Sequence, residues 1–370
     1  MKEARRLMEE GVARGVFPGG VLHVRRNRRD LFHEAYGQAD LFSRQPMTRD
    51  TVFDLASLTK PLATAPAVLK LADEGRLRLD DAVGDILPEF RGTDKHAITP
   101  VQLLLHTSGL PAHREYFLTL ARLPRQERDQ ALLRLLAGEP LEYAPGRHQV
   151  YSDLGYMVLK YVVEKVSGKR LDVFVHEFLY APLRIHDLFF IDIHREDPAA
   201  LEVMRTERAF AATEDCPRRG CLVKGMVHDD NAYEAGGVAG QAGLFGTTTA
   251  VARFLDALLD IHGGETPVGI LSRETTALML APKPGSGRTY GFDTPDRENS
   301  SAGRLFSDTT VGHLGFTGVS VWLDIARAVT VLLFTNRVHP RRDHNELKAF
   351  RPILHDAVMS ELTGQNPAVF

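Results

Sequence analysis

FDLASLTKP, at residues 53–61, is the stretch that decides the fold of this 370-residue chain. Residues three apart lie on one face of a helix, so the Ser57 hydroxyl and the Lys60 amine can meet. Pro61 locates a helix start, because proline is tolerated in the first helical turn. Backbone N–H groups at that end of a helix favour developing negative charge. The spacing therefore indicates a serine nucleophile activated by a lysine.

Ser-x-x-Lys alone also occurs by chance, as a capping serine followed by a solvated lysine. Two further motifs argue against that alternative: Tyr151-Ser152-Asp153, which leads into a helix, and His313-Leu314-Gly315, at the start of a strand-rich C-terminal part. A lysine that acts as a base must be largely neutral, so we expect the site to desolvate Lys60 or to surround it with donors.

The order and separation of the three motifs resemble the serine β-lactamase and penicillin-binding-protein superfamily. The nearest branch contains the class C β-lactamases, the D-alanyl-D-alanine peptidases and related carboxylesterases. The resemblance covers essentially the whole chain, because it extends to residues 17–20, 98–100, 103–111, 182–183, 243–245 and 335–337.

The resemblance implies a role for each motif residue. Ser57 would form the acyl-enzyme, Lys60 would assist proton transfer, and Tyr151 would shuttle the proton to the leaving group. The backbone N–H groups of Ser57 and Phe316 would form the oxyanion hole, with Phe316 on the edge strand where substrate aligns. Whether Lys60 or Tyr151 is the acylation base stays open.

Two departures from the family pattern bear on the substrate. Asp153 replaces the usual asparagine and, when ionised, only accepts hydrogen bonds. His313, followed by Leu314 and Gly315, replaces the usual lysine of Lys-Thr-Gly, and its imidazole is mostly neutral at pH 7. Both changes weaken recognition of a penicillin-like substrate and favour a neutral ester or an unusual amide, although Asp153 could instead hold Lys60 in place.

The sequence thus predicts a serine hydrolase of esterase or amidase type, acting on a small-molecule substrate. One alternative is a β-lactamase or D-alanyl-D-alanine carboxypeptidase, and a second is a non-catalytic penicillin-binding or sensor protein. The absence of Gly-x-Ser-x-Gly and His-Glu-x-x-His argues against an α/β-hydrolase and a metalloprotease.

We expect an α+β, β-lactamase/transpeptidase-like fold, with an antiparallel sheet of about five strands flanked by N- and C-terminal helices. Residues 1–56 plus 235–370 would form the sheet domain, residues 57–234 a mainly helical domain, and the active site would lie in the cleft between them. The expected terminal elements are a helix at 2–14, a hairpin at 21–24 and 31–36, strands at 309–314, 319–324 and 328–335, and a helix at 347–361.

Composition excludes several other classes. With 45 basic and 48 acidic residues the formal charge is −3, so no global field favours nucleic acid. No apolar run approaches a membrane span and no signal peptide is recognised, so we expect a cytoplasmic protein. We expect no cofactor and no metal, and the oligomeric state stays open.

A few local motifs have a structural interpretation. We expect Cys216 and Cys221 to be structural or free thiols, and His106 to be buried or capping. We expect residues 228–230 to form a loop beside the cleft or a hydrogen-bond cluster, because adjacent residues rarely converge on one metal ion. The glycine-dense segment 236–246 lacks a nucleotide-loop pattern, and we expect a tight loop close to a cleft or another backbone.

Overall fold

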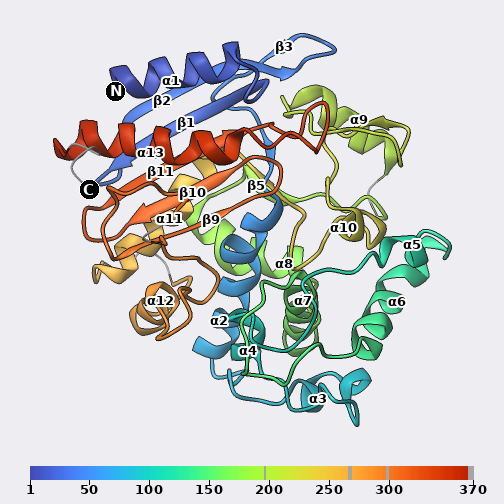
Figure 1. The fold of residues 1–370 in the computed structure, drawn as a ribbon. Helices are drawn as coiled ribbons and strands as arrows, with labels where there is room; N and C mark the ends of the chain where they lie inside the picture. The colour runs from blue at the N-terminus through green and yellow to red at the C-terminus, as the bar shows by residue number, and fades with distance from the viewer. Residues whose placement is uncertain (196, 266–268, 297–299, 366–370) are drawn as a thin grey trace.

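A six-stranded antiparallel sheet joins the two ends of the chain (Figure 1). The computed structural model describes residues 1–195, 197–265, 269–296 and 300–365. The strand order is β3-β2-β1-β11-β10-β9. The strands are β1 (Gly19–Arg26), β2 (Arg29–Asp40), β3 (Gln45–Pro46), β9 (Thr310–Leu314), β10 (Ser320–Asp324) and β11 (Val329–Thr335). Because β1 pairs with β11, the prediction that both termini build one sheet is confirmed.

Both faces of this sheet are covered by helices, as alternation along β1 requires. Val21 faces the core beneath α11 (Thr248–His262), whereas Leu22 faces a second core. That second core is closed by the terminal helices α1 (Lys2–Ala13) and α13 (Leu347–Thr363), which lie together over the sheet (Figure 1). The predicted arrangement of an antiparallel sheet flanked by N- and C-terminal helices is therefore confirmed.

The middle of the chain is mainly helical, with α7 (Asp153–Ser167) buried along most of its length. Around it lie α2 (Ala65–Asp73), α3 (Val83–Ile86), α4 (Pro100–Leu104), α5 (Phe117–Leu120), α6 (Arg125–Gly138), α8 (Leu171–Val175) and α10 (Asp230–Glu234). The sequence did not predict α9 (Pro198–Glu207) or α12 (Arg273–Leu280). The assignment of residues 57–234 to a separate domain stays a prediction.

The segment around the Ser-x-x-Lys motif does not begin as a regular α-helix. A 3₁₀ turn at Ala56–Leu58 runs into a π-helical turn at Lys60–Thr64, and α2 begins only at Ala65. Pro66 therefore lies in the first turn of α2, where its missing N–H costs no helical bond. The helix type thus changes just before Pro66.

Two smaller sheets complete the fold. The first, β4-β8-β5, consists of β4 (Phe53–Asp54), β8 (Leu244–Gly246) and β5 (Leu188–Phe190), and it fixes the residues just before Ser57. The second pairs β6 (Asp215–Cys216) with β7 (Cys221–Leu222), which sets the two free cysteines opposite each other. Among the described helices, none has both the length and the apolar character needed to cross a membrane.

Candidate active site

Ser57 follows a strained backbone position that its surroundings hold in place. Ala56 has a φ of +45°, in the left-handed region that non-glycine residues rarely adopt. The Ala56 N–H donates to Asp54 Oδ1 at 2.8 Å, and its carbonyl accepts from Thr59 Oγ1 at 2.6 Å. The Thr317 hydroxyl also donates to the Asp54 carbonyl, at 2.7 Å, and so ties β4 to the turn after β9. These bonds hold the backbone on both sides of Ser57 in place.

The Lys60 ammonium group is fully buried and has three acceptors. Its Nζ lies 3.2 Å from Ser57 Oγ, 2.7 Å from Asp153 Oδ1 and 3.1 Å from the Gln241 carbonyl. Gln241 belongs to the glycine-dense segment, which passes close to α7 as expected: a Cβ on Gly240 would lie 1.9 Å from the Tyr156 carbonyl. The spacing prediction for Ser57 and Lys60 thus has the geometry it requires.

The charge state of Lys60 differs from our expectation of a neutral base. Burial by itself lowers the pKa of Lys60, but its interactions with the Asp153 carboxylate and with Tyr151 outweigh that effect, so the pKa of Lys60 is raised. Burial likewise raises the pKa of Asp153, yet Lys60 and His113 reverse the effect and hold it well below its usual range. The pair is therefore an ammonium and a carboxylate, because each charge stabilises the other across 2.7 Å.

Tyr151 lies beside this pair with its phenol protonated. The centre of its ring is 4.9 Å from Lys60 Nζ, and burial raises the pKa of the Tyr151 hydroxyl even though hydrogen bonds to Lys60 and Ser57 oppose the rise. His106 packs on the same ring at 4.6 Å and is buried, as predicted. Its Nδ1 accepts from the Ser152 N–H at 3.0 Å, so His106 positions the tyrosine loop and its low pKa leaves it uncharged.

The C-terminal end of β9 approaches the nucleophile from the other side. Burial lowers the pKa of His313 to about 4, so this imidazole is neutral. Gly315 allows close contact, because a Cβ there would lie 2.7 Å from the Leu55 carbonyl. Among the described residues, no acceptor pairs with the Phe316 N–H. The oxyanion-hole role of this N–H stays a prediction.

Sequence motifs missed Arg288, which contributes positive charge near Tyr151. Its guanidinium carbon lies 5.3 Å from the Tyr151 ring centre, and it forms an ion pair with Asp293. Asp293 in turn bridges to Gly312 of β9 through two backbone bonds of 2.7 and 2.9 Å. Arg288 thus supplies a cation where His313 supplies none. No sequence motif marks Arg288. Its position near Tyr151 depends on how its loop packs against β9 in the folded protein.

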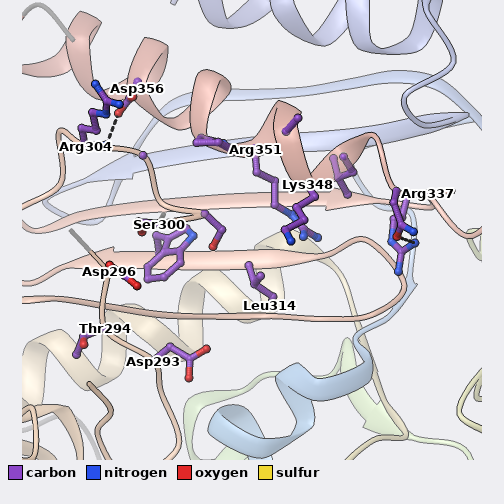
Figure 2. A pocket seen from close by; sticks show the side chains of 17 residues that line it. Asp293, Thr294, Asp296, Ser300, Arg304, Leu314, Arg337, Lys348, Arg351 and Asp356 are labelled. Atoms are coloured by element: carbon purple, nitrogen blue, oxygen red, sulfur yellow. Dashed lines mark hydrogen bonds between the residues drawn. The ribbon is translucent and has the colours of Figure 1, made fainter. Parts of the chain in front are cut away.

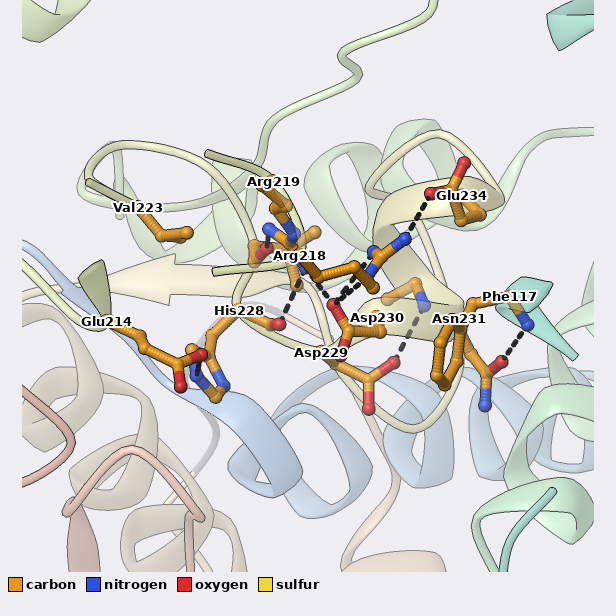
Figure 3. Close-up of polar contacts among 12 residues, drawn as sticks. Phe117, Glu214, Arg218, Arg219, Val223, His228, Asp229, Asp230, Asn231 and Glu234 are labelled. Carbon is orange, nitrogen blue, oxygen red and sulfur yellow. Dashed lines mark hydrogen bonds and ion pairs between the residues drawn. The ribbon is translucent and has the colours of Figure 1, made fainter. Parts of the chain in front are cut away.

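The residues 228–230 form a hydrogen-bond cluster beside the site (Figure 3). His228 Nε2 lies 3.2 Å from Glu214 Oε2, and Asp230 Oδ1 accepts from Arg218 and Arg219 at 2.8 Å. Asp229 accepts from the Gln241 side chain at 3.2 Å, and so links the cluster to the segment that holds Lys60. Over the described ranges, no group of three or more His, Cys, Asp or Glu side chains converges to hold a metal ion.

Comparison with known proteins agrees with this geometry. Residues 4–353 match the Beta-lactamase family. The chain is 33% identical to an N-acetylmuramyl-L-alanine amidase from Bacillus subtilis, over 92% of this chain and 81% of that protein. It is 31% identical to a putative D-alanyl-D-alanine carboxypeptidase from Escherichia coli K12, over 87% and 79%. Among solved structures, EstCE1, a hydrolase with promiscuous acyltransferase activity, superposes with a TM-score of 0.72 at 23% identity, covering 95% of this chain and 98% of EstCE1.

Proposed function

Since this chain belongs to the beta-lactamase family and is a serine hydrolase of ester or amide bonds, we propose that Ser57 is the residue that carries the acyl group. The observation that supports this assignment most directly is the contact of 3.2 Å between Ser57 Oγ and the Lys60 ammonium. We place this site in the cleft between a sheet domain, residues 1–56 plus 235–370, and a helical domain, residues 57–234. The cytoplasmic location expected from the sequence stays a prediction.

The charge states suggest how the proton moves during acylation. Ser57 Oγ attacks the substrate carbonyl carbon and its proton passes to Tyr151 Oη, while the Tyr151 proton passes to the leaving nitrogen or oxygen as that bond breaks. No free phenolate is needed in this relay, and the Lys60 ammonium stabilises the negative charge that develops on both oxygens. The backbone N–H groups of Ser57 and Phe316 would hold the carbonyl oxygen. Water then attacks the acyl carbon, and Ser57 recovers a proton.

We propose an amide as the preferred substrate. Two relatives above 30% identity are named for amide-bond hydrolysis, one at a muramyl-L-alanine bond and the other at a D-alanyl-D-alanine bond. Asp153, held by Lys60 at 2.7 Å, has no N–H to donate to an acylamide carbonyl, so penicillin-like recognition is weakened. Arg288 would pair with a substrate carboxylate in place of the lysine that His313 replaces.

One experiment separates the candidate functions. The protein and its Ser57→Ala variant are incubated with a short-chain aryl ester, N-acetylmuramyl-L-alanine, a D-alanyl-D-alanine peptide and a chromogenic cephalosporin. Turnover is followed for each, and intact mass is measured after treatment with a fluorophosphonate. We expect amide and ester turnover, and a mass increase at Ser57 only. Turnover that survives Ser57→Ala would refute the mechanism, a mass increase without turnover would favour a sensor, and fast cephalosporin hydrolysis would favour a β-lactamase.

A further inference from the structure

A cavity lies beside β9 and β10, next to α13 (Figure 2). Its volume is about 1130 Å³, and it is bounded by α13, by the segment before β9 and by side chains of β9 and β10. Leu314 and Trp322 line the cavity. Because successive strand residues point to opposite faces, Leu314 faces away from the side to which His313 points. The cavity therefore lies on the face of β9 opposite to His313, although Asp293 and Arg337 of its lining also contact Arg288 and Phe316.

Arg351 of α13 is a buried cation that lines this cavity without an anionic partner. Its side chain is only 7% exposed, and one terminal nitrogen donates to the Val319 carbonyl at 3.2 Å. Its buried Nε has no hydrogen-bond acceptor, and within the described part of the chain it forms no ion pair. Burial lowers the pKa of Arg351 to about 9, with a further contribution from Arg337. Buried arginines are normally paired, so this one indicates a missing acceptor.

Other residues that line the cavity also present hydrogen-bond donors. Lys348, one helical turn from Arg351, is exposed, and Arg337 donates only to oxygens of carbonyls and of one side-chain amide. The indole N–H of Trp322 is buried without an acceptor. Figure 2 shows Lys348 and Arg351 close together above Leu314. An anionic group with several acceptor oxygens would satisfy Arg351 and Lys348 better than a neutral hydroxyl, which accepts at most two hydrogen bonds and carries no charge.

The carboxylates that line the cavity are already engaged elsewhere. Asp293 is paired with Arg288, and Asp356 accepts from the backbone N–H groups of Arg304 and Leu305 at 2.6 and 3.3 Å. Asp296 also has an interaction partner. The positive charge of Arg351 is therefore left for a ligand.

We propose that this cavity binds an anionic small molecule, whose carboxylate or phosphate group contacts Arg351 and Lys348 and whose ring or alkyl part packs on Trp322. Neither Arg351 nor Lys348 has a role in the proposed acyl transfer at Ser57, so this binding can be tested apart from that reaction. Two ligand sources share this chemistry, a carboxylic acid and a phosphate ester, and they are distinguished by the probes below.

Trp322 is the only tryptophan of the chain, so its fluorescence reports on the cavity directly. We would titrate the full chain with phenyl phosphate, benzoate and inorganic phosphate at constant ionic strength, with phenol as the uncharged probe. A saturable change in emission is expected with phenyl phosphate or benzoate and not with phenol. The stronger of the two anions identifies the class of ligand.

Matched variants test the assigned contacts. Lys348→Ala should weaken binding about tenfold and Arg351→Gln should abolish it, because each removes a charged donor. Lys165→Ala, an exposed cation on α7 outside the cavity, should leave binding unchanged. Ser57→Ala should also bind normally, which keeps this test apart from the proposed function. A response that is absent at millimolar probe, or equal in wild type and Lys348→Ala, would overturn the proposal.

Discussion

The ion pair between Lys60 and Asp153 can be tested by removing its members separately and together. Lys60→Met deletes the ammonium while keeping a side chain of similar length, and Asp153→Asn removes the carboxylate charge with almost no change of shape. In Lys60→Met, Asp153 keeps only His113, whose Nδ1 lies 3.8 Å away on a half-exposed ring. The double variant contains neither charge. If the pair is ionised, the double variant should be more stable than Lys60→Met alone.

The geometry sets the size of the effect. At a separation of 2.7 Å the two charges attract by about 6 kcal/mol for an effective dielectric constant of ~20, before desolvation is subtracted. Breaking a buried pair from one side costs about 3–5 kcal/mol, and we expect about 3 kcal/mol for Lys60→Met because His113 remains. The double variant should lie within about 1 kcal/mol of wild type, because removing both charges leaves none unpaired.

Urea unfolding at pH 7, followed by both Trp322 fluorescence and circular dichroism, measures these differences. The fold lowers the pKa of Asp153, so its contribution is complete above the unfolded carboxyl value of about 3.9 and is lost as the pH falls below it. The advantage of wild type over Lys60→Met should therefore shrink in acid, because protonation of Asp153 removes the unpaired charge of that variant. Equal losses in Lys60→Met and in the double variant at pH 7 would refute the reasoning, because Asp153 would then carry no unpaired charge.

Three further results are expected. Tyr151→Phe should lower kcat by about 10²–10⁴-fold in steady-state assays, because the relay loses its hydroxyl, and an unchanged kcat would exclude that role. Arg288→Gln should raise KM about tenfold for a carboxylate-bearing amide and leave a neutral ester unaffected, whereas equal changes for both would contradict a charge contact. Gly315→Ala would place a methyl group 2.4 Å from Val319 Cγ2, which should cost about 1–3 kcal/mol in thermal unfolding and also lower kcat; a fully stable, active variant would contradict this packing.

Local sequence patterns predicted most helices and strands in and around the large sheet, because each such element is determined by residues close together in the sequence. The hairpin β1–β2 and the strands β9 to β11 follow from runs of apolar residues bounded by turns, and their bounds agree within about three residues at most ends. The helix α9 was missed because only Leu201 of its ten residues is buried, so its apolar periodicity is weak. The sequence also did not predict the change of helix type before Pro66, because apolar periodicity does not reveal a π-helical turn.

The candidate site likewise contains residues that local motifs predicted and residues that they did not. Ser57, Lys60 and Tyr151 stand in motifs, and the structure brings their side chains together. The charge on Lys60 did not follow from its own motif, because it depends on Asp153, 93 positions away in sequence. Arg288 reaches Tyr151 only through the folded loop beside β9, and no local pattern marks it.

The pairing of β1 with β11 has a consequence for synthesis. Gly20 lies opposite Thr335. Strand β1 of the large sheet therefore has no β11 to pair with until the residues of β11 have been made. The turn that carries Phe316 also comes late in the sequence, so a nascent chain contains Ser57 long before it contains Phe316. Contacts this distant in sequence close late in folding. We therefore expect hydrolysis to start only after the residues of β11 have been made.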